Sequence, residues 1–330
     1  MQSQAVTPAG SSATSGIAFI LVGMVAISIN DMLIKQLSGD YPLHQMVFIR
    51  SAIGIVFSLM LVQYEGGFGI LRTKTPMLHI IRGLLVVVSN MTFFTALAVI
   101  PLADATALFF VAPLMITLFS IPLLGEKVGP LRMGAVIVGF VGVVIMMRPW
   151  QSAEESEVNR LVLLLPVLAA TTYALNQIMT RKLGVVSKAS ALAVYIQSMF
   201  IVVSLGFFIF AGDGRFAEGL TNESLIFLLR EWVWPQDSDW YLFWGLGLNA
   251  AIIGYALSQA YRLASAATIA PFEYVGLPLA VFWGWMLWGE LPGPAIVTGI
   301  VLIVASGLFV FFRERRKNRP LVKKRVHRRY

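Results

Sequence analysis

The sequence has no cysteine and few charged residues. Of its 330 residues only three are histidine, and Asp, Glu, Lys and Arg together make up 13%. Without cysteine, the chain can form no disulfide, thiolate nucleophile or cysteine-ligated metal site. It also contains no GxSxG, HExxH or P-loop motif. These absences argue against an enzyme, and we expect neither a cofactor nor a metal site.

Apolar residues occur in place of the missing charges. They make up 58% of the chain, against roughly 45–50% in an ordinary soluble domain. They gather in blocks of about 20 residues, the length that an α-helix needs to cross a bilayer. We therefore predict an all-α integral membrane protein with ten transmembrane helices. The expected spans are 16–36, 43–63, 78–99, 102–124, 130–148, 160–181, 189–211, 240–262, 266–288 and 294–312.

The net charge of +8 comes largely from the C-terminal tail, since ten of the 25 basic residues lie between Arg313 and Arg329. An even number of spans places both termini on one side, and basic flanking segments stay in the cytoplasm. We expect a disordered leader over 1–15 and a basic cytoplasmic tail over 313–330, in a bacterial inner membrane. A charge confined to the tail predicts no nucleic-acid partner.

The long connection between Gly212 and Asp239 is expected on the outer side. Its apolar stretch contains two tryptophans and follows the candidate helix cap Asn222. We predict a short interfacial helix over about 223–234. Whether it acts as an anchor or as a substrate lid stays open, although tryptophans at an interface favour an anchor.

The two halves of the chain resemble each other. Asn30 matches Asn176, and Arg50 matches Gln197 in the following span. We predict two five-helix repeats, 16–148 and 160–312, joined by an outer linker over 149–159. Because five is odd, the second repeat enters the membrane with inverted topology, as in alternating-access transporters. The matching segments are 29–37 with 175–183, 47–51 with 194–198, and 123–126 with 287–290.

A family resemblance rests on the fourth and fifth spans. The segment AlaAspAlaThrAlaLeuPhePheValAlaPro (103–113), the GlyGlu at 125–126 and the ArgPro at 148–149 have counterparts in the second half. Over about 16–312 the chain resembles EamA-type members of the drug/metabolite transporter superfamily. The resemblance implies a central cavity for organic solutes. Its members include exporters of amino acids and drugs and uptake carriers for S-adenosylmethionine and riboflavin, and the first half looks closest to the last two.

Asp31 and Arg50 are ionisable residues within the apolar layer, where charge is costly. They lie at matching depths in the first and second spans, so we predict that they interact, as a gating element or as an ion pair. Two alternatives stay open. Lys35 has the i,i+4 spacing for a surface pair with Asp31. An arginine like Arg50 is common in EamA-type proteins, which favours a structural or gating role over a contact with the substrate.

Glu273 lies near the midplane of the ninth span, between Pro271 and Pro278. Each proline removes an intrahelical hydrogen bond, and broken helices line the binding sites of transporters. We predict that Glu273 carries a coupling proton or binds a cationic group of the substrate. A protonated, purely structural glutamate is the alternative.

Further polar and aromatic side chains complete the candidate substrate site. Amides near mid-membrane can instead bond between helices, and rings can simply pack rather than bind an aromatic or sulfonium group. Asp104, at the start of the fourth span, is expected to cap a helix and is left out of the site. The set is Asn90, Asn176, Tyr173, Asn249, Tyr255, Gln259, Tyr274, Phe94 and Phe110.

Together these features predict a secondary-active transporter, driven by protons or by exchange, because no nucleotide-binding motif is present. The expected substrate is a small cationic, zwitterionic or aromatic metabolite such as S-adenosylmethionine or riboflavin. We expect the bilayer as a partner and no obligate protein partner. An exporter of amino acids or drugs, and a membrane receptor or channel, are the alternatives.

Overall fold

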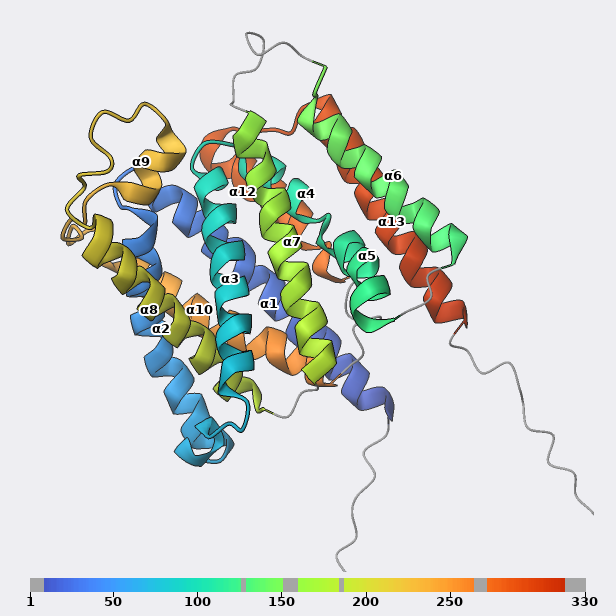
Figure 1. The fold of residues 1–330 in the computed structure, drawn as a ribbon, viewed down its shortest axis with the longest axis horizontal. Coiled ribbons are helices and arrows are strands. Elements are labelled where there is room, and N and C mark those ends of the chain that lie inside the picture. Colours follow the sequence, from blue (N-terminus) through green and yellow to red (C-terminus); the bar gives the residue numbers. More distant parts are fainter. Residues whose placement is uncertain (1–8, 126–128, 151–159, 184–186, 264–271, 318–330) are drawn as a thin grey trace, which may run out of the picture.

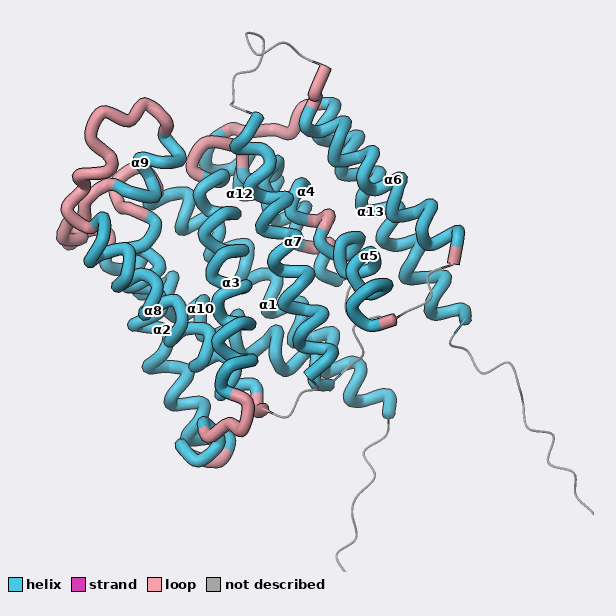
Figure 2. The backbone as a smooth tube through the Cα atoms, in the orientation of Figure 1, coloured by secondary structure: helices cyan, strands magenta, loops and turns pink. Residues whose placement is uncertain are grey.

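The structure is a computed structural model that describes residues 9–125, 129–150, 160–183, 187–263 and 272–317. Every regular element in these ranges is helical, and short loops join the helices (Figure 2). The helices are α1 (Ala9–Leu37), α2 (Leu43–Glu65), η1 (Phe68–Leu71), α3 (Pro76–Leu97), α4 (Leu102–Phe109), α5 (Ala112–Leu124), α6 (Pro130–Met147), α7 (Arg160–Leu183), α8 (Ala189–Ala211), α9 (Glu223–Leu229), α10 (Trp240–Leu263), α12 (Gly276–Trp288) and α13 (Pro294–Lys317).

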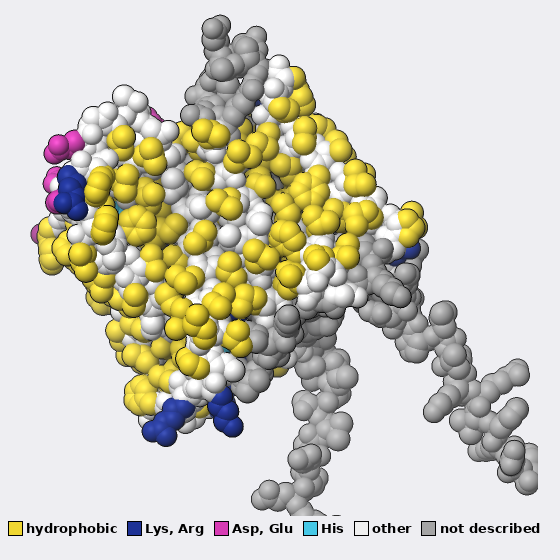
Figure 3. Space-filling model, in the orientation of Figure 1, with side chains coloured by type: hydrophobic (Ala, Val, Ile, Leu, Met, Phe, Trp, Pro, Cys, Tyr) yellow, Lys and Arg dark blue, Asp and Glu magenta, His cyan; other side chains and the backbone are white. Residues whose placement is uncertain are grey.

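Seven helical stretches within the described ranges are long and apolar enough to cross a membrane. Large apolar side chains also face outward, with Ile209 78% and Met60 62% exposed. Figure 3 shows hydrophobic side chains over most of the visible face and charged ones at its ends. Such a surface is stable in lipid and costly in water. The chain is therefore a multi-pass α-helical membrane protein.

The count of ten spans stays a prediction. Three shorter apolar helices coincide with the fifth, ninth and tenth predicted spans, and residues 266–271 of the ninth lie outside the described ranges. The shorter helices are Met133–Met147, Gly276–Trp288 and Pro294–Phe309.

The fourth predicted span, 102–124, is two helices rather than one. Helix α4 ends at Phe109, a turn follows, and α5 begins at Ala112. Pro113 causes the break, because proline has no amide hydrogen to bond the carbonyl four residues earlier. A similar turn precedes α12, four residues before Pro278.

Helices α5 and α12 match each other closely. Each has 13 residues, and each ends on a glycine in the left-handed region, Gly125 with φ 69° and Gly289 with φ 67°. Helices α2 and α8 likewise have 23 residues each. Matched elements in the two halves are what an inverted repeat would produce.

Helix packing joins the two halves of the chain. Helix α1 packs on α10, α3 on α7, α2 on α8, and α6 on α13, the last pair lying side by side in Figure 1. The α6 and α13 backbones approach closely at Gly142 and Gly299, where a Cβ atom on either would lie about 3 Å from the carbonyl oxygen of the other. The N-terminal end of α1 and the C-terminal end of α13 lie toward the same end of the bundle (Figure 1).

The predicted interfacial helix is shorter than expected. Asn222 does cap it, because its side chain accepts a hydrogen bond from the Leu225 amide at 3.1 Å. However, α9 ends at Leu229 instead of about residue 234. The following residues bond to other segments: Arg230 donates to the carbonyls of Gly39 and Ser38, and the Val233 amide donates to Gln45. These tertiary hydrogen bonds replace the helical ones.

Candidate substrate site

Arg50 of α2 is buried, with 5% of its surface exposed. Its guanidinium donates to the Asn30 side-chain oxygen at 3.2 Å and to that of Asn90 at 2.7 Å. It also lies over the rings of Phe94 and Phe200, at 5.7 and 5.1 Å from their centroids. Amide oxygens and ring faces both stabilise a buried cation. Arg50 thus links α1, α2, α3 and α8.

Asp31 reaches Arg50 through an amide and not directly. The Asn30 side chain donates to the Asp31 carboxylate at 3.2 Å while its oxygen accepts from Arg50. The two charges interact electrostatically, as predicted, but through Asn30 and without a direct salt bridge between the described side chains. The alternative pair of Asp31 with Lys35 is wrong, because the Lys35 ammonium lies 2.7 Å from the Glu290 carboxylate.

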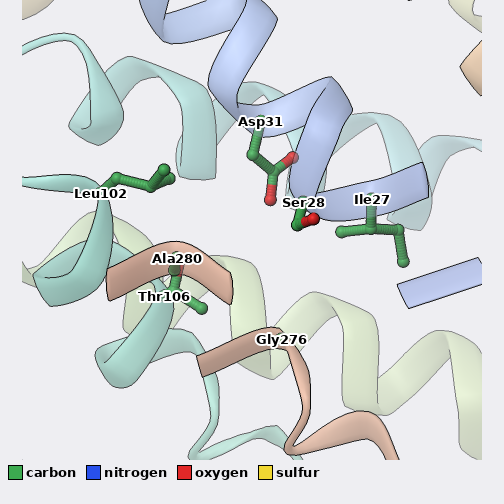
Figure 4. Close-up of a pocket in the computed structure, with 7 residues that line it drawn as sticks. All are labelled: Ile27, Ser28, Asp31, Leu102, Thr106, Gly276 and Ala280. Carbon is green, nitrogen blue, oxygen red and sulfur yellow. The ribbon is translucent and has the colours of Figure 1, made fainter. Parts of the chain in front are cut away.

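A small cavity lies beside Asp31, between α1, α4 and α12 (Figure 4). Its volume of about 20 Å³ is enough for one water-sized ligand. The Thr106 hydroxyl on its wall is buried and has no hydrogen-bond partner among the described residues. Ser28 donates to the Val25 carbonyl at 2.9 Å. The lining residues are Ile27, Ser28, Asp31, Leu102, Thr106, Gly276 and Ala280.

Glu273 belongs to a second polar cluster, built from α7, α10 and the segment before α12. Its carboxylate accepts a hydrogen bond from the Tyr261 hydroxyl. Tyr173 interacts with both Glu273 and Tyr261. Tyr274 packs against Phe110 with ring centroids 5.4 Å apart. None of the described lysine or arginine side chains interacts with the Glu273 carboxylate.

A row of aromatic rings connects the two clusters. The ring of Phe94, beside Arg50, lies 5.4 Å from Phe93, which lies 5.5 Å from Phe109. Phe109 in turn lies 5.4 Å from Tyr173, beside Glu273. These distances are typical of attractive edge-to-face and tilted ring pairs. The row crosses the protein interior from one charged cluster to the other.

Gln259, Tyr255 and Asn249 lie outside these two clusters. Gln259 donates to Tyr255 at 3.0 Å and to Glu65 at 3.1 Å, where α2 ends. Asn249 donates to a backbone carbonyl of its own helix. Asn176 is buried in α7. The candidates therefore do not form one continuous site in this conformation.

Sequence reasoning missed three residues that the structure places in these clusters. Asn30 bridges Asp31 and Arg50, and its recurrence as Asn176 in the repeat was a usable signal. Tyr261 lies near the end of the eighth span, where an aromatic residue is typical of an interfacial belt. Thr106 lies among small residues, with no local signal that its hydroxyl would face a cavity.

Another charged cluster joins α1 to the segment between α12 and α13. Lys35 donates to both carboxylate oxygens of Glu290, at 2.9 and 2.7 Å, and to the Ile100 carbonyl. Asp104 interacts with Lys35, Glu290 and Arg148. The expected cap is wrong, because α4 has Pro101 at its N-cap position and no side-chain cap bond. Asp104 lies within the first turn of α4 and faces these charges instead.

Comparison with known proteins identifies the family. A model described as the EamA-like transporter family matches residues 14–148. A riboflavin transporter of Vibrio cholerae is 30% identical over 308 residues, which cover 93% of this chain and 93% of that protein. The chain belongs to the EamA-like transporter family. As a member, it is a membrane transporter with a small-molecule substrate.

Other EamA-like relatives carry different substrate names. An S-adenosylmethionine uptake transporter of Rickettsia prowazekii is 26% identical, over 92% of this chain and 94% of that protein. A pseudopaline exporter of Pseudomonas aeruginosa is also 26% identical, over 88% and 94%. A crystal structure of a protein 20% identical to this chain shares the fold, with a TM-score of 0.62 over 94% of this chain and 99% of that one.

Proposed function

We propose that this EamA-like transporter is a secondary-active carrier of a cationic, zwitterionic or aromatic metabolite in a bacterial inner membrane. Riboflavin and S-adenosylmethionine are the first candidates, because relatives with these substrate names align with more than nine-tenths of the chain. Protons or solute exchange supply the energy. The basic tail supports cytoplasmic termini, and reporter fusions after Ser187 and after Gly219 should then report opposite sides.

The observation that carries the substrate class is the aromatic row that ends at Glu273. Phe93, Phe109 and Tyr173 present ring faces and edges, which suit a flavin, an adenine or a sulfonium group. The carboxylate beside Tyr173 has no described basic partner. A cationic substrate group would supply the missing charge, and a proton would do the same.

Alternating access requires the small cavity beside Asp31 to open. Pockets for small molecules usually have volumes of roughly 300–1,000 Å³, whereas the cavity beside Asp31 has about 20 Å³. Helices α1, α4 and α12 must therefore separate before a metabolite can enter. The matched lengths of α5 and α12 support two inverted repeats, 16–148 and 160–312, as the moving halves.

Counterflow in proteoliposomes tests this function. Vesicles loaded with unlabelled riboflavin or S-adenosylmethionine should accumulate the labelled compound transiently, because a carrier exchanges substrate across the membrane. A channel would show equilibration without this overshoot. The absence of exchange with both compounds, and with the hits of a thermal-shift screen against a metabolite library, would contradict the proposal.

Export is the second candidate direction, because the pseudopaline exporter aligns with 88% of this chain. A growth assay distinguishes uptake from export. In a bacterium that cannot synthesise riboflavin, an uptake carrier should lower the external riboflavin concentration needed for growth. An exporter should raise that concentration or leave it unchanged.

A further inference from the structure

The cavity beside Asp31 is unsuited to a metabolite but well suited to a water molecule. It has room for one water-sized ligand, and the residues that line it include Asp31, Ser28 and Thr106. The remaining wall is apolar, formed by Ile27, Leu102 and other residues. An anionic carboxylate beside such a surface is costly, and a proton removes that cost.

Thr106 supplies an independent observation. It is only 8% exposed, and its hydroxyl has no hydrogen-bond partner among the described residues. A carboxylate can only accept hydrogen bonds, whereas a protonated carboxyl group also donates one. The Thr106 hydroxyl both donates and accepts, so a water molecule in the cavity would give it a partner, and a protonated Asp31 carboxyl group could also donate to its oxygen.

The same cavity lies where the two halves of the chain meet. Ile27, Ser28 and Asp31 come from α1 and Thr106 from α4, whereas Gly276 and Ala280 belong to α12. An occupant between these helices must respond when they separate. On the other side, Asn30 connects Asp31 to Arg50, so the charge on Asp31 also affects the link between α1 and α2.

We propose that the cavity lined by Asp31, Ser28 and Thr106 is the site of the coupling proton. Hydronium from solution gives its proton to the Asp31 carboxylate, which becomes a neutral carboxylic acid, and the water molecule stays in the cavity. Glu273, at the far end of the aromatic row, then binds the cationic group of the substrate. The coupling role rests on the proposed transport function, whereas the proton site itself does not.

Few other charges act on this site. Arg50 interacts with Asp31 from α2. Lys35, one turn along α1, is held by Glu290, and Asp104 of α4 interacts with that pair. Among the described residues of α3, α10 and α12, no ionisable side chain interacts with Asp31.

Thermal unfolding of the purified protein without substrate, measured over a range of pH, tests the proton site. A folded chain that binds a proton which the unfolded chain releases loses stability as pH rises. Relative to Asp31→Asn, the wild-type melting temperature should therefore fall with rising pH, by a shift on the order of a few degrees. Asp237→Asn, at an exposed position, is the matched control and should follow the wild type. Parallel curves for wild type and Asp31→Asn would overturn the proposal.

Two further measurements complete this test. Thr106→Val keeps the shape of the side chain and removes the hydroxyl. Its melting temperature should therefore begin to fall at a lower pH than that of the wild type. A melting curve over pH that matches the wild type would contradict the role of Thr106, even if Asp31→Asn fails to fold.

Replacing choline chloride with sodium chloride at constant pH should leave the melting temperature unchanged. A rise with sodium that Asp31→Asn lacks would assign the site to Na⁺ and overturn the proton.

Transport then tests the coupling role. In proteoliposomes, Asp31→Asn should lose accumulation under a pH gradient and keep counterflow, since exchange needs no net proton movement. Normal accumulation by Asp31→Asn would overturn the coupling role. If the wild type exchanges none of the tested metabolites, the proposed function fails, while the stability measurements still decide the proton site.

Discussion

The two carboxylates of the interior differ in how the protein compensates their charge. Asp31 is connected to Arg50 through one amide, whereas Glu273 accepts a hydrogen bond from a tyrosine hydroxyl and has no described basic partner. A substrate cation beside Asp31 would meet the charge of Arg50 and a cavity of only about 20 Å³, far smaller than a metabolite site of roughly 300–1,000 Å³. Beside Glu273 it would supply the missing charge. The difference favours a proton for Asp31 and a substrate for Glu273.

The largest expected effect tests the compensation of Asp31. Arg50→Gln introduces the residue that the second half already has at Gln197, and it leaves the Asp31 carboxylate without its cation. The change also removes the hydrogen bonds of the buried guanidinium to Asn30 and Asn90, and a hydrogen bond to a charged group contributes about 1.5–3 kcal/mol to the free energy of unfolding. Adding Asp31→Asn should recover part of this loss, measured by denaturation and by transport. Strict additivity of the two changes would show that the charges are independent and would remove the basis of the comparison.

Glu273→Gln tests the other carboxylate. Loss of a charge-assisted contact costs about 2–3 kcal/mol, so the substrate should bind roughly 30–150-fold more weakly. Both counterflow and accumulation should then fall. Glu223→Gln, at the exposed start of α9, is the control and should behave as wild type. Intact counterflow with lost accumulation would instead make Glu273 the proton carrier and reverse the assignment of the two residues.

The sequence predicts the boundaries of the helices better than it predicts the polar contacts between them. The span boundaries follow from local apolar composition, so the ends of α2 and α8 agree with the expected spans within two residues. The break after Phe109 was missed, although Pro113 carries the physical reason for it. The polar contacts were harder to predict. Nothing local indicates that the Asn30 amide would lie between two charges, because that position depends on the packing of α1 on α2.

The same limit applies to the connection of the clusters. The sequence indicates Phe94 and Tyr173 as site residues but does not connect them, since the row between them depends on how α3, α4 and α7 pack. The sequence pairs Lys35 only with Asp31, its neighbour along the helix, whereas its partner Glu290 is 255 positions away in the chain. Contacts over such separations require the tertiary fold.

The Lys35 and Glu290 pair provides a smaller test, which concerns closure of the bundle and not the substrate. It connects α1, which lines the Asp31 cavity, to the segment after α12. Lys35→Gln removes a charge-assisted bond in a partly exposed setting, so we expect a loss of about 1.5 kcal/mol in unfolding free energy. Exchanging the two charges, with Lys35→Glu and Glu290→Lys together, should restore most of it. A double variant no better than the single ones would show that the pair does not hold these segments together.

The smallest expected effect is at Phe109, midway along the aromatic row. Phe109→Leu keeps the position apolar and removes the ring contacts with Phe93 and Tyr173. Aromatic pairs contribute about 0.5–1.5 kcal/mol beyond burial, so the affinity for an aromatic substrate should fall about 2–10-fold, as measured by competition in counterflow. The pH dependence of the melting temperature should stay that of the wild type, because Asp31 lies at the other cluster. If Phe109→Leu instead changed that pH dependence and left the affinity intact, the aromatic row would connect the two carboxylates and would not bind the substrate. The separate roles of Asp31 and Glu273 would then have to be abandoned.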